Sequence, residues 1–591
     1  MTADPLPIDW TEDGRPRSAL YGDAYFGADD GLSESRAVFL EGCGLPGAWA
    51  GRQSFTVAEL GFGTGLNMLA LLDLWRREGP AEGQLHLFSV EAHLMTREDA
   101  ARALAAWPDL SEVAEALLTR WPARRRGFHR IAFPEYRACL DLALLEAGEA
   151  LSVWNGRADA WFLDGFAPAL NPEIWRDEVL QGVAARSAPG ARAATFTVAG
   201  QVRRGLSAAG FEVRRAPGHG RKRERLEAIF PGEGRDPAGP GGVAVVGAGI
   251  AGASVVRALR RLGVEPVHFE AEAPGAGASG NPAGLVTPRL DAGLGPVARL
   301  AAQAYLRALD VYPEVPGAVL ARGVLQLAAT DRDPSRFARI AGSDLFPEGT
   351  LRLLDPAGAS ARLGESSDRA GLDQPDALSL DPRQVLEAWC AVPLAGRVQT
   401  LERTEGGWRL TTAANETSVF RTVILAAGAG LDRLWLEAPI LPVRGQASWI
   451  STPEQEAPRA AGWGGYLAPL AGGFLFGATF RRGETSTVVT EADHQANLEA
   501  LARARPALAA DLSGRTLEGR ARVRATTRDH LPLAGPVPGT PGLFVLGGLG
   551  SRGLTWAPLL GEHLAALAAG APSPLPEDLA GLVAPGRYSA G

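Results

Sequence analysis

Short runs of consecutive apolar residues alternate with longer stretches in which apolar residues recur at the period of an α-helix. The runs stand at residues 55–60, 85–90 and 159–163 in the N-terminal part of the chain, and at 243–246, 423–427 and 543–546 in the C-terminal part. Residues 68–77, after the first run, have helical spacing. Strand-length runs that alternate with helices are typical of βαβ units and parallel sheets. The pattern therefore predicts two α/β domains in tandem.

Proline and glycine are concentrated at residues 231–242, between these two regions. Such a composition is typical of an exposed connection between domains. A chain of 591 residues is also long enough for several hydrophobic cores. We therefore predict a first domain at residues 1–232, a linker at 233–242 and a second domain at 243–591.

Composition places the chain among soluble globular proteins, with 46% hydrophobic and 21% charged residues. No apolar run approaches the roughly 18 residues of a membrane span, and the acidic N-terminal residues do not resemble a signal peptide. Cys43, Cys139 and Cys390 lie too far apart in sequence for a Cys-x-x-Cys metal site. We expect a cytoplasmic protein without a metal or a membrane partner.

The net charge of -8 gives no sign of a nucleic-acid partner, but basic residues are unevenly distributed. One cluster contains Arg203, Arg204, Arg214, Arg215, Arg221, Lys222, Arg223 and Arg225, and a second contains Arg120, Arg124, Arg125, Arg126 and Arg130. Such clusters fit either a surface that follows RNA phosphates or two solvated faces. Charge alone leaves both interpretations open.

A glycine-rich turn follows the first apolar run of the N-terminal domain. Alternating glycines at a strand-to-helix turn let the backbone approach a ligand closely, and acidic residues at neighbouring strand ends can accept hydrogen bonds from ribose hydroxyls. The predicted cosubstrate-binding residues are Glu59, Gly61, Gly63, Gly65, Asn67 and Glu91. The run at 159–163 delivers Asp164 to the same edge of the predicted sheet.

The Glu-x-Gly-x-Gly-x-Gly pattern at 59–65 resembles class I S-adenosylmethionine-dependent methyltransferases. Segments 23–26, 31–39, 59–67 and 161–172 together resemble the methyltransferase half of the MnmC family, bifunctional enzymes that make 5-methylaminomethyl-2-thiouridine at the tRNA wobble position. One position departs from the expected pattern: Leu145-Glu146 stands where a Gly-Asp pair would bind the adenine amine.

Methyl transfer to an amine explains the choice of an acid at position 164. The amine must arrive neutral and in line with the donor methyl group, so a neighbouring carboxylate can hold it and accept its proton. We predict Asp164 as the catalytic residue, with Phe166 and Pro168 as an apolar wall. Tyr25 and Phe26 are predicted to stack on an unpaired base, with core packing as the alternative.

The second domain begins with a dinucleotide fingerprint. Gly247, Gly249 and Gly252 follow a strand-length run, a helix pattern comes next, and Glu270 ends the following run. In this arrangement a pyrophosphate lies at the helix N-terminus and the acid binds the adenosine ribose.

Later glycine turns resemble FAD-dependent amine oxidoreductases of the glycine and D-amino acid oxidase type. The further FAD-binding residues that this resemblance predicts are Ser279, Gly280, Asn281, Gly428, Gly550, Ser551, Gly553 and Leu554. It also implies that Arg524 and Arg552 act in catalysis by holding a substrate carboxylate, which a guanidinium matches with two parallel hydrogen bonds. Arg522 and Arg528 are expected at the surface.

Segments 441–448, 477–480, 525–532 and 549–554 again resemble the MnmC family, in its oxidoreductase half. The resemblance implies a Rossmann-like class I methyltransferase domain followed by an FAD-binding α/β domain with an antiparallel substrate subdomain. It further implies that the FAD domain removes the carboxymethyl group of 5-carboxymethylaminomethyl(-2-thio)uridine in the tRNA anticodon loop, and that the first domain methylates the resulting amine. We expect a monomer.

Two alternatives remain at this point. The chain could be a fused oxidase and N-methyltransferase of small amines such as sarcosine, with basic clusters that only face solvent. Alternatively, the first domain could be a tRNA-binding module that has lost methylation, which the departure at Leu145-Glu146 would explain. Salt-dependent tRNA binding and methyl transfer separate these hypotheses.

Overall fold

The computed structural model describes residues 8–27, 30–220, 222–233, 241–390, 394–451, 457–512 and 514–588. These residues form two compact units. The first contains the described residues up to 233 together with 261–263 and 570–577, and the second contains the others. Most of the predicted linker, residues 234–240, lies outside the described residues.

The first unit is built on an eight-stranded sheet, counted over the described residues, with the strand order β5-β6-β4-β3-β7-β8-β10-β9. The strands are β3 (Ser54–Leu60), β4 (Gln84–Val90), β5 (Gly127–Phe133), β6 (Ala138–Leu144), β7 (Ala158–Leu163), β8 (Ser187–Thr195), β9 (Glu212–Pro217) and β10 (Glu224–Ile229). β6, β4, β3, β7 and β8 run parallel, and the remaining strands are antiparallel to their neighbours. The carboxyl ends of the parallel strands therefore meet at one edge.

Both faces of this sheet are buried under helices. Along β3, Phe55 and Val57 pack into one hydrophobic cluster, whereas Ala58 and Leu60 pack into another on the opposite face. The helices are α1 (Gly31–Ser35), α2 (Leu66–Glu78), α3 (Arg97–Leu104), α4 (Ser111–Thr119), α5 (Ala147–Val153), α6 (Asp177–Ala185) and α7 (Gly200–Ala208). A parallel sheet covered on both sides needs such continuously apolar strands, which explains the uninterrupted runs in the sequence.

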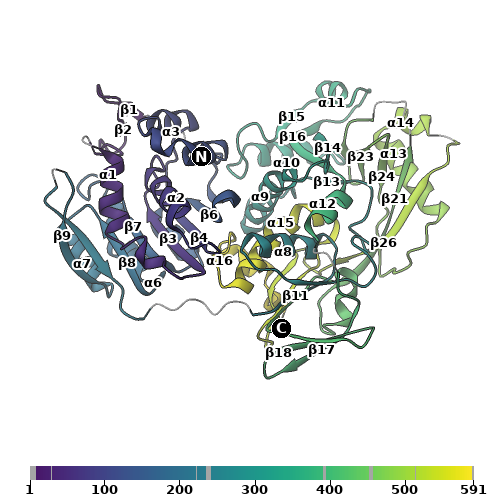
Figure 1. Cartoon of the computed structure of the whole chain (residues 1–591). Helices are drawn as coiled ribbons and strands as arrows, with labels where there is room; N and C mark the ends of the chain where they lie inside the picture. The colour runs from purple at the N-terminus through teal and green to yellow at the C-terminus, as the bar shows by residue number, and fades with distance from the viewer. Residues whose placement is uncertain are drawn as a thin grey trace. The chain divides into compact units, whose positions relative to one another are not determined.

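The second unit, whose ribbon runs from teal through green to yellow in Figure 1, has a five-stranded sheet within the described part of the chain. The strand order of this sheet is β12-β11-β20-β28-β27. Its strands are β11 (Val243–Val246), β12 (Val267–Phe269), β20 (Thr422–Leu425), β27 (Leu533–Pro536) and β28 (Leu543–Gly547). All but β27 are parallel. Helix α8 (Ile250–Arg261) follows β11, and α15 (Gly553–Ala569) follows β28. These two strand-to-helix turns are the glycine turns that the sequence predicts.

A larger, mostly antiparallel sheet forms the second layer of this unit. Its strands are β13 (Gly284–Val286), β14 (Val319–Leu327), β15 (Arg352–Leu354), β16 (Gly371–Leu380), β21 (Leu441–Ser451), β22 (Ala461–Gly462), β23 (Tyr466–Leu470), β24 (Gly473–Gly477), β25 (Arg481–Arg482) and β26 (Glu518–Thr526). Helices α9 (Pro296–Val311), α12 (Pro382–Trp389) and α13 (Glu491–Ala504) lie in the same unit. The predicted fold class, including its antiparallel subdomain, is confirmed.

Candidate functional site

A cavity of about 970 Å³ opens at the carboxyl ends of the parallel strands in the first unit. The predicted residues that line it are Gly61, Gly63, Asn67, Glu91, Asp164, Tyr25, Phe26 and Phe166. Glu59, Gly65 and Pro168 do not line it. Most of the residues predicted from the sequence to form this site therefore meet at one edge of the sheet, although they come from segments more than a hundred positions apart.

Gly61 turns the chain away from β3 and into the cavity wall. Its φ is +91°, and a Cβ at this position would collide with the backbone carbonyl oxygen of Asp164. Only glycine combines this backbone conformation with such a close approach to the segment after β7. The turn therefore places the glycine loop and the predicted catalytic carboxylate side by side.

Glu91 closes the opposite side of the glycine loop. Its Oε2 accepts a hydrogen bond from the Gly63 backbone N–H at 2.9 Å, and its Oε1 accepts one from the His93 N–H at 2.8 Å. Burial raises the pKa of this carboxyl. Each carboxylate oxygen has further lone pairs, so Glu91 can hold its loop and still accept hydrogen bonds from ribose hydroxyls.

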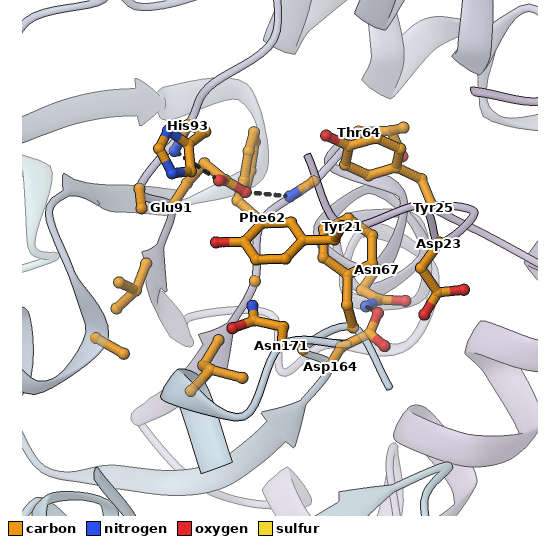
Figure 2. Close-up of a pocket in the computed structure, with 18 of the residues that line it drawn as sticks. Tyr21, Asp23, Tyr25, Phe62, Thr64, Asn67, Glu91, His93, Asp164 and Asn171 are labelled. Carbon is orange, nitrogen blue, oxygen red and sulfur yellow. Dashed lines mark hydrogen bonds between the residues drawn. The ribbon is translucent and has the colours of Figure 1, made fainter. Parts of the chain in front are cut away.

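A chain of buried polar groups stands behind Asp164. The Asn67 Nδ2 donates hydrogen bonds to the Asp164 Oδ2 at 2.6 Å and to the Glu59 Oε1 at 3.0 Å. Ser89 Oγ donates to the other Glu59 oxygen at 2.6 Å. Figure 2 shows Asn67 and Asp164 side by side in the cavity wall. Glu59, predicted to bind the cosubstrate, is fully buried and instead holds Asn67.

Burial also sets the protonation of these carboxyls. It raises the pKa of Asp164 to about 7, with the Asn67 hydrogen bond acting in the opposite direction. Burial raises the pKa of Glu59 well above its usual range. A carboxyl that titrates near neutrality is matched to accepting a proton at physiological pH. A carboxyl with this pKa in the cavity wall can act as a general base.

Aromatic rings form the wall above Asp164. The ring centroids of Tyr25 and Phe166 are 5.1 Å apart, and those of Tyr21 and Phe166 are 5.2 Å apart. Phe26 lines the cavity and also packs edge-on against Trp107, with the two ring centroids 4.7 Å apart. This contact is the core packing that the sequence analysis gave as the alternative to base stacking. The apolar wall thus consists of Phe166 and the two tyrosines, without Pro168.

Several lining residues were not nominated from the sequence. Tyr21, Glu34, His93 and Lys222 all line the cavity, and Lys222 Nζ pairs with the Glu34 carboxylate at 2.6 Å. Tyr21 and His93 lie outside the motifs identified above, whereas Glu34 lies in segment 31–39 and Lys222 in the first basic cluster. Only the fold brings the four side chains to one cavity. The Leu145-Glu146 pair, whose departure from the expected pattern was noted above, also lines this cavity.

A second cavity, of about 870 Å³, lies in the second unit at the ends of β11, β20 and β28. The predicted residues that line it are Gly247, Gly249, Glu270, Ser279, Asn281, Gly428, Gly550, Ser551, Gly553, Leu554, Arg524 and Arg552. Gly252 and Gly280 do not line it. At Gly252 a Cβ would collide with the Gly247 carbonyl oxygen, so this glycine serves the packing of α8 against β11.

The dinucleotide end of this cavity is organised by Glu270 and Ser279. Glu270 Oε2 accepts a hydrogen bond from the Ala248 N–H at 2.6 Å, which joins the acid to the glycine turn. Ser279 Oγ accepts one from the Ile250 N–H, the first residue of α8, at 3.0 Å. A Cβ on Gly428 would meet no protein atom within 4 Å, so the space beside that turn is open. The residues present therefore fit an FAD molecule.

Two arginines stand at the other end of the cavity. Arg524 donates hydrogen bonds to Ser551 Oγ at 3.0 Å and to the Thr479 carbonyl oxygen at 3.1 Å. Arg552 Nη1 donates to Thr287 Oγ1 at 2.9 Å, and burial lowers the pKa of Arg552 to about 10. Burial lowers the pKa of Arg524 as well. Neither arginine has an acidic partner among the described residues, so both can receive a carboxylate.

The other two arginines of this motif behave differently from each other. Arg528 is exposed, as expected. Arg522, also expected at the surface, lines the cavity and donates a hydrogen bond to the Ala276 carbonyl oxygen at 2.8 Å. Strand β26 places alternate residues on opposite faces, so Arg522 shares the inward face of Arg524.

The basic clusters of the first unit are partly neutralised. Acidic partners lie within 3.0 Å of Arg120, Arg126, Arg130, Arg214, Arg215, Lys222 and Arg225. Arg203, Arg204 and Arg223 are exposed, and Arg221 lies outside the described residues.

No group of His, Cys, Asp or Glu side chains in the described part of the chain could hold a metal ion. Over the same residues, no helix is long and apolar enough to cross a membrane.

Comparisons with known proteins agree with this architecture. A family model described as FAD dependent oxidoreductase matches residues 242–567, and one described as S-adenosyl-L-methionine-dependent methyltransferase matches residues 108–231. In solved structures, L-proline dehydrogenase from P. horikoshii has a TM-score of 0.50 at 18% identity, over 59% of this chain and 98% of that chain. Amadoriase I from Aspergillus fumigatus also gives 0.50, at 16% identity, over 59% and 90%. These likenesses concern the fold of the second unit.

Full-length relatives carry both units in the same order. A protein of Caulobacter sp. (strain K31), named tRNA 5-methylaminomethyl-2-thiouridine biosynthesis bifunctional protein MnmC, is 56% identical over 99% of this chain and 98% of its own length. A protein of the same name from Maricaulis maris (strain MCS10) is 43% identical over 100% and 97%. With two cofactor cavities in one chain and identity of this extent along its whole length, the chain belongs to the MnmC family of bifunctional tRNA-modifying proteins.

Proposed function

We propose that this protein carries out two consecutive steps on the wobble uridine of tRNA. The FAD domain, residues 243–591, removes the carboxymethyl group of 5-carboxymethylaminomethyl(-2-thio)uridine to leave the aminomethyl base. The methyltransferase domain, residues 1–232, then methylates that amine with S-adenosylmethionine. The observation that carries this proposal is the agreement of the whole chain, in domain order, with the family. The alternative function, oxidation and N-methylation of small amines such as sarcosine, is not favoured. It accounts for no feature of the chain that membership of the family does not already explain.

In the FAD domain, this chain's residues bind and orient the substrate. Arg524 and Arg552 hold the carboxylate with paired, charge-assisted hydrogen bonds. Gly247, Glu270 and Ser279 would hold FAD, which when bound would accept two electrons as the methylene beside the amine is oxidised. Loss of two electrons and two protons converts the C–N bond to an imine, and water hydrolyses it to glyoxylate and the aminomethyl base. No side chain is required as a base when the amine is neutral.

In the methyltransferase domain, Asp164 holds the amine and accepts its proton. Asn67 fixes one carboxylate oxygen through its 2.6 Å hydrogen bond, which leaves the other oxygen for the substrate. Tyr25 and Phe166 exclude water around the amine, and this apolar wall favours its neutral form. Displacement at the donor methyl group then needs only alignment of the two partners.

The methyl donor is held by the loop and acids around the same cavity. Gly61 and Gly63 let the donor approach the backbone, and Glu91 accepts hydrogen bonds from its ribose hydroxyls. Glu146, in the cavity wall at the start of α5, takes the place of the expected aspartate opposite the adenine. This assignment favours an active first domain over a module that has lost methylation.

The RNA partner is the anticodon loop of tRNA, and the protein acts on it as a monomer. A base in a single-stranded loop can leave its stack and enter either cavity without disrupting a duplex. The exposed basic residues Arg203, Arg204 and Arg223 supply positive charge on the first unit for the RNA phosphates.

Mass spectrometry of wobble nucleosides tests the proposal. Purified protein is incubated with tRNA carrying the carboxymethylaminomethyl group, with and without S-adenosylmethionine. We expect the aminomethyl base without the donor and the methylaminomethyl base with it. Arrest at the aminomethyl base in both reactions would identify an inactive first domain. An unchanged tRNA despite bound flavin would refute the proposed substrate.

A further inference from the structure

Phe480 is an exposed aromatic residue at the flavin cavity. Its side chain is 51% exposed, and among the exposed large hydrophobic residues of the described chain it alone lines either cavity. About half of this residue is therefore open to a ligand that enters the cavity, and covering it would bury further apolar surface. The ring lies in the segment 477–480, which resembles the family. Neither the binding of the cofactor nor the binding of the substrate carboxylate explains why a phenylalanine stands there.

Two guanidinium groups lie near this ring. The Cζ atoms of Arg482 and Arg524 each lie 5.9 Å from the Phe480 ring centroid, a distance at which a cation is attracted to an aromatic face. Arg482 is exposed, whereas Arg524 lies in the cavity wall. The aromatic ring thus lies near both an arginine that faces solvent and the arginine predicted to bind the substrate carboxylate.

The segment that carries Phe480, residues 479–490, is fixed to the sheet at its beginning. The Thr479 N–H donates to the Gln446 carbonyl oxygen at 3.1 Å, and the Gln446 N–H donates to Thr479 Oγ1 at 2.9 Å. Arg481 donates two hydrogen bonds to the Asp493 Oδ1 at 2.8 and 3.1 Å. Phe480 therefore sits between two anchored residues.

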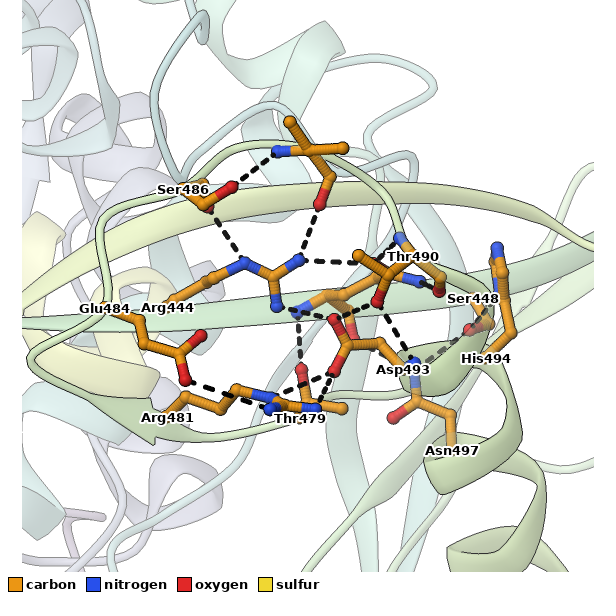
Figure 3. Close-up of polar contacts among 12 residues, drawn as sticks. Arg444, Ser448, Thr479, Arg481, Glu484, Ser486, Thr490, Asp493, His494 and Asn497 are labelled. Atoms are coloured by element: carbon orange, nitrogen blue, oxygen red, sulfur yellow. Dashed lines mark hydrogen bonds and ion pairs between the residues drawn. The ribbon is translucent and has the colours of Figure 1, made fainter.

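A buried ion pair fixes the rest of this segment (Figure 3). Arg444 on β21 pairs with Asp493 on α13 at 2.6 Å, with side-chain exposures of 3% and 1%. The same guanidinium donates to the carbonyl oxygens of Ser486 at 2.9 Å and Val488 at 2.6 Å. Because the segment is tied down at both ends, the exposed ring is presented in a fixed place, which lowers the entropy cost of stacking a ligand on it.

The distance between Arg524 and Phe480 suits a ligand that carries a carboxylate a few bonds away from a planar base. In the proposed substrate, four single bonds of about 1.5 Å separate the carboxylate carbon from C5 of the uracil ring, a span of roughly 5 Å. When the carboxylate is on Arg524, a linker of this length lets the uracil ring lie against the Phe480 ring, whose centroid is 5.9 Å from the Arg524 Cζ. Stacking on an aromatic side chain is how proteins hold unpaired bases.

We propose that Phe480 is a stacking platform for the unpaired pyrimidine ring of the substrate nucleotide at the entrance of the flavin cavity. Arg482 binds the adjoining phosphate, and the residue pair makes the site selective for RNA over small glycine-like amines. This proposal rests on the proposed function of the FAD domain and extends it to a base-binding subsite.

The test compares Phe480→Ala, Phe480→Trp and Phe480→Leu in the full-length protein loaded with FAD. Anaerobic reduction of the flavin is followed by absorbance as the concentration of tRNA carrying the carboxymethylaminomethyl group is varied. From the usual contribution of one base stack, we expect Phe480→Ala to raise the half-saturating tRNA concentration about 5- to 100-fold. The limiting reduction rate changes little, and Phe480→Trp restores affinity whereas Phe480→Leu does not.

Val488→Ala is the matched control, because Val488 is 66% exposed on the same segment but does not line the cavity. Equal effects of Phe480→Ala and Val488→Ala, or full restoration by Phe480→Leu, would overturn the proposal. If the wild-type flavin is not reduced by this tRNA, the proposed function fails. In that case the shift of the flavin spectrum on titration with the anticodon stem-loop still decides whether Phe480 binds the base.

Discussion

Asn67→Ala tests whether the buried polar chain behind Asp164 controls methyl transfer. The substitution removes the amide that donates to Asp164 Oδ2 at 2.6 Å and leaves the carboxyl group in place. A hydrogen bond to the ionised form stabilises the anion, so its loss raises the pKa. Because proton transfer needs the deprotonated carboxylate, the pH dependence of methylation should move to higher pH.

The size of this shift follows from the strength of the bond. A hydrogen bond to a charged group contributes about 1.5–3 kcal/mol, and 1.36 kcal/mol corresponds to one pKa unit, so we expect a rise of about 1–2 units. The wild-type pKa of Asp164 is about 7. At pH 7 the deprotonated fraction then falls about 5- to 50-fold, whereas at pH 9.5 the variant returns to within about twofold of wild type.

The assay is single-turnover methyl transfer to tRNA carrying the aminomethyl base, at saturating S-adenosylmethionine, between pH 6 and 9.5. Asn171→Ala is the control, since Asn171 lines the same cavity but has no hydrogen bond to Asp164. Binding of S-adenosylmethionine to the variant shows that its first domain is folded. An Asn67→Ala profile with the wild-type midpoint, lowered equally at all pH values, would refute the positioning of Asp164 by Asn67.

Four further outcomes are expected. Asp164→Asn lowers methyl transfer about 10²- to 10⁴-fold, because it removes the proposed general base, and tRNA accumulates the aminomethyl base in mass spectra. Arg524→Ala lowers kcat/KM for carboxymethyl removal by about 30-fold or more, whereas the exposed Arg528→Ala leaves steady-state kinetics unchanged. Glu270→Ala removes the carboxylate expected to bind the FAD ribose and its 2.6 Å hydrogen bond from the Ala248 N–H. FAD then binds more weakly, so the flavin absorbance that the protein retains after dialysis falls. Asp493→Asn leaves two arginines without their buried partner and lowers the free energy of unfolding by about 3–5 kcal/mol in denaturant titrations.

Local patterns determined the two cofactor regions. Gly61 and Gly247 have φ values of +91° and +112°, and both lie at strand-to-helix turns that the sequence predicts. These features could be predicted because a strand, a glycine turn and a helix are adjacent in sequence, and because few residues other than glycine adopt such φ values. Arg524 was found through its motif in the same way, since the residues around it follow a recognisable pattern.

Tertiary structure alone decided what surrounds each nominated side chain. Glu59 belongs to the glycine motif but does not line the cavity. It accepts hydrogen bonds from Asn67 on α2 and Ser89 on β4, because its place on β3 lies beside these two elements. Phe26 packs against Trp107, and Phe480 is exposed beside Arg524. A motif fixes the path of its own backbone, but a side chain's neighbours come from strands and helices that are distant in the chain. Their packing, and with it the exposure, the pKa and the partner of each group, is therefore determined only by the folded structure.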